Sequence, residues 1–198
     1  EVLVDVKDAM GANAVNTVAE AVGPRVAEIV GGRVFLRILT NLCDRRLARA
    51  RCRIPVELLA VDGIGGADVA RGIVEAYRFA AVDPHRAATH NKGIMNAVDA
   101  IAIATGNDWR ALEAGAHAFA ARSGRYGPLS TWRLNDGVIE GFLEMPLAVG
   151  IVGGPIALHP KVRRALALVG AATSRELAAY MAAAGLAQNL AALRALGS

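Results

Sequence analysis

RAATHNKGIMNAVDAIAIATGND, residues 86–108, is the most informative segment of the chain. Its polar residues recur at steps of three and four, and the remaining positions are mainly Ala, Ile, Met and Val. This spacing predicts one long helix, with Asp83 as N-cap, Pro84 in the first turn and an end near Ala104. A helix with so many apolar positions is usually buried, so we expect it to lie at the centre of the domain.

The polar positions of this helix fall on one stripe, which contains Arg86, Thr89, Lys92, Asn96 and Asp99. A buried lysine needs a charge partner or an anionic ligand, and Asp99 and Asp108 are the candidate partners. A lysine held by a carboxylate stabilises negative charge that develops on a carbonyl oxygen, and an arginine fork holds a carboxylate. The stripe therefore indicates a site for an anionic carbonyl substrate. The alternative is a solvated face or a structural ion pair.

The composition limits the class of protein. Of the 198 residues, 54% are hydrophobic, which excludes disorder, and only 5% are aromatic, which favours a helix-rich or α/β architecture with an aliphatic core. The net charge of +4 permits anionic substrates without requiring nucleic acid. Cys43, Cys52 and the four scattered histidines form no ligand cluster, so we expect reduced thiols and no metal. No apolar run is long enough to span a bilayer, and we expect a cytoplasmic protein.

The rest of the chain mixes both kinds of secondary structure. Alternating apolar residues predict strands at 2–6, 33–40 and 47–54, and a hairpin of 129–134 with 138–144 around Asn135-Asp136-Gly137. Predicted helices follow residue 13 (interrupted at Gly23-Pro24), then cover 67–80 and 108–122, and start at His159-Pro160, at Thr173 with a possible capping box, and after Gly185.

The segment DAMGAN, residues 8–13, joins a predicted strand to a predicted helix through a turn that contains Gly11. Such a turn before a helix N-terminus binds anions or nucleotides. Asp8 would repel a phosphate but suits a ribose hydroxyl or a helix cap. A capped helix start is therefore the alternative.

Two other patterns carry weaker signals. Gly63-Ile64-Gly65 has Asp68 where a dinucleotide fingerprint needs its third glycine, so we interpret it as a loop. The basic run from Arg45 to Arg53 places Arg49, Arg51 and Arg53 on one strand face. This face either contacts phosphates or is solvated and ion-paired, and no aromatic residue interleaves with it as in single-strand binders.

Three motifs together resemble a known family: Asp8–Asn13 (DAMGAN), Arg86–Asn96 (RAATHNKGIMN) and Ala104–Ala111 (ATGNDWRA). They resemble 3-hydroxy-3-methylglutaryl-coenzyme A (HMG-CoA) reductase of the second, bacterial class. EAGAHA at 113–118 and GLAQNL at 185–190 extend the resemblance over essentially the whole chain.

The resemblance implies an α+β fold. Residues 1–40 would be the tail of a small, ferredoxin-like, non-Rossmann NAD(P)-binding domain. Residues 41–198 would be part of a helix-rich large domain, built around a central buried helix, that binds HMG-CoA and forms a homodimer with a shared active site. The implied reaction interconverts HMG-CoA with mevalonate plus CoA through two hydride transfers, with NAD as cofactor and NADP possible. Neither a membrane nor nucleic acid is an implied partner.

The resemblance also implies roles for individual residues. Lys92 matches the catalytic lysine that polarises the thioester and aldehyde oxygens, and Asp108 matches the aspartate that hydrogen-bonds this lysine. The matches to substrate-binding residues are Arg86, Thr89, Asn96, Gln188 and Asn189. The matches to cofactor-binding residues are Asp8, Met10, Gly11 and Asn13.

The chain departs from the family pattern in two places. The family's proton-donating glutamate and its histidine in a Gly-His-Met context are not among the 198 residues. The abrupt ends fit a chain that lacks an N-terminal half and a C-terminal flap. Two other hypotheses remain: a catalytically inactive fragment that dimerises and binds HMG weakly, and a nucleic-acid binder that uses Arg45–Arg53.

Overall fold

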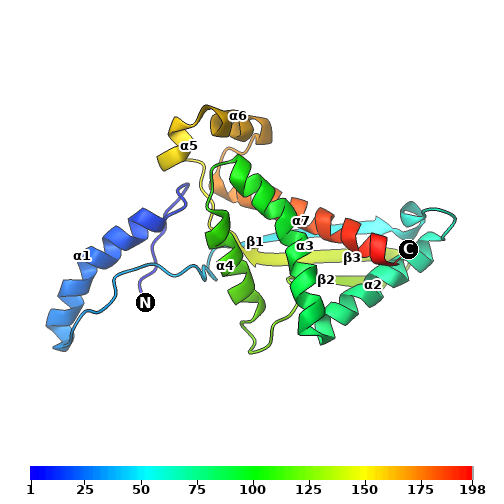
Figure 1. Ribbon diagram of the computed structural model, residues 1–198, viewed down its shortest axis with the longest axis horizontal. Helices are drawn as coiled ribbons and strands as arrows, with labels where there is room; N and C mark the ends of the chain where they lie inside the picture. Colours follow the sequence, from blue (N-terminus) through cyan, green and yellow to red (C-terminus); the bar gives the residue numbers. More distant parts are fainter. Residues whose placement is uncertain (198) are drawn as a thin grey trace.

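The computed structural model describes residues 1–197 and has an α+β architecture. Figure 1 shows a cluster of helices in front of a small sheet, with one helix standing apart near the N-terminus. The elements are α1 (Ala12–Val30), β1 (Leu47–Pro55), the 3₁₀-helix η1 (Val56–Leu59), α2 (Gly66–Val82), α3 (Pro84–Ala104), α4 (Trp109–Ala120), β2 (Ser130–Asn135), β3 (Val138–Pro146), α5 (Gly154–Leu158), α6 (Pro160–Val169) and α7 (Ser174–Gly197).

The three strands form an antiparallel sheet in the order β1-β3-β2. The β2–β3 hairpin closes at Asn135↔Val138, with Asp136 at φ 46° and Gly137 at φ 73°. Two consecutive positive φ values are what an Asp-Gly hairpin turn supplies, so the predicted hairpin is confirmed. β1 pairs with β3 from Leu47↔Pro146 to Pro55↔Val138, which confirms the arginine-rich strand.

The arginines of β1 are ion-paired across the sheet. Arg49 Nε lies 2.6 Å from Glu144 Oε2, and Arg53 Nε lies 3.0 Å from Glu140 Oε1. The Arg51 guanidinium lies 5.3 Å from the centroid of the Phe142 ring between these pairs. The ion-paired interpretation of this face is therefore confirmed.

The hydrophobic core lies between the sheet and the helices α2, α3 and α7. α3 contributes Ile94, Met95 and Val98, each at most 1% exposed, and these side chains pack with buried residues of α7 and of the sheet. Gly185, predicted as a break, lies inside the continuous helix α7, where an added Cβ would lie 3.0 Å from Ile94 Cγ2. A small residue here lets α7 and α3 approach closely, so close packing explains this glycine and the predicted break is wrong.

The first forty residues differ most from the predictions. Residues 2–6 and 33–40 have no regular secondary structure and join no strand among the described residues, so the two predicted strands are wrong here. Alternation indicates an extended chain, whereas a strand also needs a hydrogen-bonding neighbour. α1 runs through Pro24, and it buries no residue. Because α1 is solvated, water can satisfy the carbonyl that loses its partner at the proline, and the predicted interruption is wrong.

Two N-caps predicted from sequence are present. The Asp83 carboxylate accepts a hydrogen bond from His85 N at the start of α3. Thr173 Oγ1 accepts from Glu176 N before α7, while Glu176 Oε2 accepts from Ala172 N, one residue earlier than a capping box requires. Across the described part of the chain, every helix is too short or too polar to cross a bilayer.

Candidate active site

The polar stripe of α3 faces an open hollow of about 1060 Å³ between α2, α3 and the end of α7. The hollow brings together five of the residues predicted for substrate binding or catalysis: Arg86, Thr89, Lys92, Asn96 and Asn189. The neighbouring Gln188 is exposed on α7 and does not line the hollow. The stripe thus presents two cations and several hydrogen-bonding groups to one open space, which suits an anionic ligand.

Lys92 is exposed and makes no ion pair among the described residues. The expectation that this lysine is buried is therefore wrong. Asp99, the nearer predicted partner, contacts Glu113 of α4 instead. The helix is buried on one side only, and the lysine lies on the other side.

Asp108 lies far from Lys92 in the same chain. Twelve residues of α3 separate Lys92 from Ala104, which at the rise of an α-helix is about 18 Å. Asn107 N donates to the Ala102 carbonyl, so the chain remains at that end of α3. The Asp108 carboxylate caps α4 by accepting from the amides of Arg110 and Ala111. Lys92 and Asp108 therefore do not pair within one chain.

Asp108 borders a second hollow of about 1020 Å³. Met10 and Gly11, two of the predicted cofactor-binding residues, line it together with Asp108. Asp8 and Asn13 do not line this hollow. The Asp8 Oδ1 atom accepts from Ser174 N, 2.8 Å away, and so caps the N-terminus of α7. The predicted residues that line a hollow are thus divided between one hollow with Lys92 and another with Asp108, while Asp8, Asn13 and Gln188 line neither.

Gly11 determines the shape of the turn beside this second hollow. It precedes α1 with φ 102°, a conformation that side chains other than glycine's disfavour. A Cβ at this position would also lie 2.8 Å from a methyl carbon of Val6. The turn that the sequence predicts at residues 8–13 is therefore built around this glycine.

Asn189 belongs to a buried polar network at the edge of the Lys92 hollow. Its Oδ1 atom accepts from Ser130 Oγ and from Trp132 Nε1, each at 2.8 Å, and Ser130 Oγ lies 2.7 Å from His90 Nε2. Burial, and secondly the charge of Arg86, lowers the pKa of His90 to about 4, so its imidazole is neutral at pH 7. No local pattern indicates His90, Ser130 or Trp132, because membership of this network depends on tertiary contacts.

We expect Asn189→Ala to destabilise the protein. The substitution leaves the Ser130 hydroxyl and the Trp132 indole N–H buried without an acceptor, which costs about 1–3 kcal/mol per group. The matched control is Gln188→Ala, because Gln188 is the exposed neighbour on the same helix. Urea denaturation should show a loss of about 2–4 kcal/mol for Asn189→Ala and less than about 0.5 kcal/mol for the control. Equal midpoints for the two variants would contradict the role of this network.

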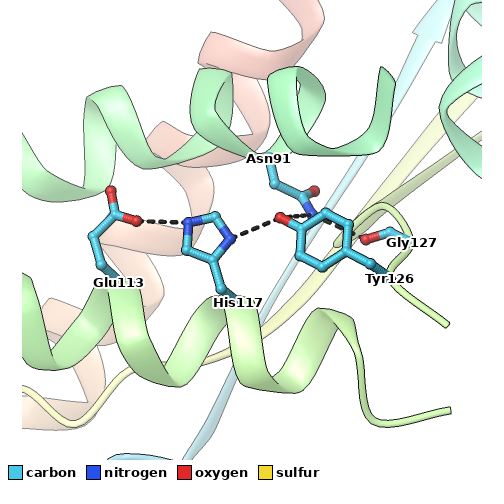
Figure 2. Close-up of polar contacts among 5 residues, drawn as sticks. All are labelled: Asn91, Glu113, His117, Tyr126 and Gly127. Atoms are coloured by element: carbon cyan, nitrogen blue, oxygen red, sulfur yellow. Dashed lines mark hydrogen bonds and ion pairs between the residues drawn. The ribbon is translucent and has the colours of Figure 1, made fainter. Parts of the chain in front are cut away.

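A second polar network connects α3 to α4 (Figure 2). Asn91 Nδ2 donates to the Tyr126 hydroxyl at 3.0 Å and to the Gly127 carbonyl at 2.9 Å. The Tyr126 oxygen lies 2.7 Å from His117 Nδ1, and His117 Nε2 lies 2.6 Å from Glu113 Oε2. Since the hydroxyl oxygen already accepts from Asn91, its own proton is free for His117 Nδ1. In this arrangement the Nε2–H group of His117 donates to Glu113 Oε2.

Glu113 also contacts Asp99, so two carboxyl groups meet between α3 and α4. Burial, followed by the hydrogen bond to Glu113 and the charge of Glu113, raises the pKa of Asp99 to about 7. The buried Asp99 Oδ1 atom has no hydrogen-bond partner among the described residues. A proton held by Asp99 is therefore what stabilises this contact.

This pair predicts a pH dependence of stability. The ordinary pKa of an aspartate is 3.8, so the folded protein binds the proton more tightly than the unfolded chain. The contribution of Asp99 to stability is present below pH 4 and is lost as the pH rises to about 7. Asp99→Asn keeps a donor toward Glu113 without a charge, so the variant should gain stability relative to wild type across this range. Denaturation at several pH values measures the difference, and Asp44→Asn, at an exposed position, is the control.

The structure is an α+β chain in which one helix face presents a lysine and an arginine to an open hollow and a glycine turn precedes another helix. The family model described as hydroxymethylglutaryl-coenzyme A reductase matches residues 1–198. The chain belongs to the HMG-CoA reductase family.

Two curated relatives are similar along nearly all of the chain. A 3-hydroxy-3-methylglutaryl-coenzyme A reductase of Archaeoglobus fulgidus is 53% identical over 197 residues, which are 99% of this chain and 44% of the relative. A probable reductase of Borreliella burgdorferi is 36% identical over 98% of this chain and 45% of the relative. The chain thus spans less than half the length of these relatives.

Solved structures agree on the fold. A 3-hydroxy-3-methylglutaryl-coenzyme A reductase of Streptococcus pneumoniae is 47% identical with a TM-score of 0.94, over 98% of this chain and 53% of that one. A class II reductase of the same organism, bound to NADPH in open conformations, is 48% identical with a TM-score of 0.94, over 98% of this chain and 47% of that one. The resemblance found in the sequence motifs is therefore confirmed.

No group of three His, Cys, Asp or Glu side chains that could hold one metal ion occurs within residues 1–197.

Proposed function

We propose that the protein containing this chain is an HMG-CoA reductase that interconverts HMG-CoA with mevalonate plus CoA. The observation that carries the proposal is the stripe of Arg86, Thr89, Lys92 and Asn96 along one open side of α3. In the direction of synthesis, two reduced nicotinamides and two protons convert the thioester to a primary alcohol and release CoA as a thiol. The names of the relatives support this reaction.

The side chains of the stripe have distinct tasks in this proposal. The Arg86 guanidinium holds the free carboxylate of HMG, because its fork matches two carboxylate oxygens. The Lys92 ammonium lies at the reacting carbonyl and stabilises the negative charge that hydride addition places on its oxygen. Thr89, Asn96, Gln188 and Asn189 complete the substrate contacts. The side-chain oxygen of Asn189 already accepts two hydrogen bonds, so Asn189 mainly supports the floor of the hollow.

A nicotinamide cofactor supplies the hydride when it is bound. We propose that the turn with Asp8, Met10, Gly11 and Asn13 binds this cofactor, since Met10 and Gly11 line the second hollow. A relative was solved bound to NADPH, which supports a nicotinamide in this family. The resemblance favours NAD for this protein, and a comparison of the rates with NAD and NADP tests this choice.

We further propose that the active site is shared between two copies. Lys92 lies about 18 Å along α3 from the helix end that Asp108 follows, so the lysine–aspartate pair of this proposal forms between subunits. Apolar side chains at the Lys92 hollow support a covering copy: Phe79 is 55% exposed and Leu196 is 61% exposed. In this dimer the Asp108 hollow of one subunit faces the Lys92 stripe of the other.

The division into two domains remains a proposal. Residues 1–40 would belong to a small ferredoxin-like cofactor domain, and residues 41–198 to the large substrate-binding and dimerisation domain. Exposed apolar side chains in the first part support this division, since Phe35 is 80% exposed and Leu36 is 74% exposed. We also propose a cytoplasmic location. The free thiols of Cys43 and Cys52 support it, because thiols stay reduced in that compartment.

The reverse reaction tests the function directly. The complete protein is incubated with mevalonate, CoA and NAD, and the absorbance of reduced nicotinamide is followed. Turnover is the expected result, and a folded, dimeric protein without turnover with either NAD or NADP would contradict the proposal. Residues 1–198 alone should not turn over, because they contain no histidine in a Gly-His-Met context and lack the family's upstream glutamate.

A further inference from the structure

Arg46 holds the turn at residues 7–10 from inside the fold. Its Nη1 atom donates to the carbonyls of Ala9 and Met10, each at 3.0 Å. Its Nη2 atom donates to the carbonyl of Val149 and, at 3.4 Å, to the carbonyl of Lys7 and to Ser174 Oγ. One guanidinium therefore joins the turn to the segment after β3 and to the start of α7.

The charge of Arg46 is satisfied by dipoles and not by a carboxylate. The side chain is half-buried and makes no ion pair among the described residues. Burial lowers the pKa of this guanidinium, but an arginine remains charged at neutral pH. Converging backbone carbonyls compensate the charge, so their positions are fixed by the arginine. Moving the turn would leave a half-buried cation without acceptors, which is costly.

Other contacts hold the same turn against the same two segments. Ile151 N donates to the Asp8 carbonyl at 2.9 Å, and Ser174 Oγ donates to the Lys7 carbonyl at 3.0 Å. An added Cβ at Gly150 would lie 2.4 Å from Met10 N, so the backbones touch there. Each of these contacts fixes one point of the turn, whereas Arg46 contacts three of its carbonyls.

We propose that Arg46 is the positioning residue of the nicotinamide-binding turn: it fixes Met10 and Gly11 relative to the large domain without touching the cofactor. This inference rests on the proposed function. It also gives a role to the basic run, in which Arg49 and Arg53 form ion pairs on the sheet and Arg46 points into the fold.

The geometry of the contact requires arginine. Five acceptors lie around the two terminal nitrogens of Arg46, which carry four N–H donors in the plane of one rigid guanidinium. A lysine places its three donors on one atom, so it cannot reach both Met10 and Val149. Arg46→Lys therefore keeps the positive charge but removes the planar arrangement of donors. Arg45→Lys is the matched control, because Arg45 is the exposed neighbour.

Two readouts on the complete protein test the proposal. Hydrogen exchange of the amides of residues 9–13 should be faster in Arg46→Lys and unchanged in Arg45→Lys. In steady-state assays we expect KM for the nicotinamide to rise about tenfold in Arg46→Lys, while KM for HMG-CoA changes less than about twofold. Ser174→Ala removes one contact of the guanidinium together with the hydrogen bond from Ser174 Oγ to the Lys7 carbonyl. It should shift both readouts in the same direction by less than Arg46→Lys, which keeps the test informative if Arg46→Lys folds poorly.

The outcomes separate this inference from the proposed function. Unchanged exchange in both Arg46→Lys and Ser174→Ala overturns it, and so does a parallel rise in KM for both substrates. A wild-type protein that turns nothing over counts against the proposed function instead. Exchange and direct titration with reduced nicotinamide then decide the role of Arg46.

Discussion

In the complete protein, Lys92→Ala should lower kcat by about 10²–10³-fold, the range found when one preorganised donor to a developing oxyanion is removed. The ammonium is exposed in the hollow and makes no ion pair among the described residues, so the free energy of unfolding should change by less than about 0.5 kcal/mol. Loss of rate with intact stability is the signature of a catalytic contact. Steady-state kinetics and urea denaturation of the same preparation measure both quantities.

Lys161→Ala is the matched control, because Lys161 is also exposed on a helix, in α6, and does not line the hollow. It should keep the wild-type rate. KM for HMG-CoA should rise little in Lys92→Ala, because Arg86 still holds the carboxylate. A Lys92→Ala protein with wild-type kcat would remove Lys92 from the chemistry and with it the central claim of the proposed function.

The stripe on α3 could be predicted because it depends on local sequence. Periodicity placed Arg86, Thr89, Lys92 and Asn96 on one face, and Asp83 marked where the helix begins. Periodicity does not give the environment of that face. The stripe was expected to be buried, but Lys92 is exposed, because the apolar remainder of α3 packs on one side only.

Contacts between segments far apart in the chain could not be predicted from the sequence. Nothing local distinguishes Arg46 from Arg45, although Arg46 reaches carbonyls more than a hundred positions away at Val149. The network of His90, Ser130 and Asn189 likewise joins three elements. The predicted strands at 2–6 and 33–40 show the opposite error, since a local signal was present without any neighbour to pair with.

The separation of Lys92 from Asp108 makes the shared site testable by mixing inactive subunits. Asp108→Asn should lower kcat by about a hundredfold, because it removes the charge that accompanies the lysine. Asparagine is as good an N-cap as aspartate, so α4 keeps its start and the effect is electrostatic. Asp83→Asn, which makes the same change at the cap of α3, is the matched control and should stay active.

Lys92→Ala and Asp108→Asn subunits are each inactive as homodimers, so the mixed dimer decides which subunits build the site. If Lys92 of one copy pairs with Asp108 of the other, a mixed dimer has one site with both residues altered and one site with both intact. Random co-assembly then restores about one quarter of the wild-type activity, since half of the dimers are mixed and each has one intact site. If both residues served the same site from one chain, every site in every dimer would carry one substitution and no activity would return. Coexpression of two differently tagged variants and assay of the whole dimer pool tests the one-quarter value, whereas tandem purification isolates the mixed dimer, which should have about half of the wild-type activity. Inactive mixed dimers would overturn the intersubunit pair.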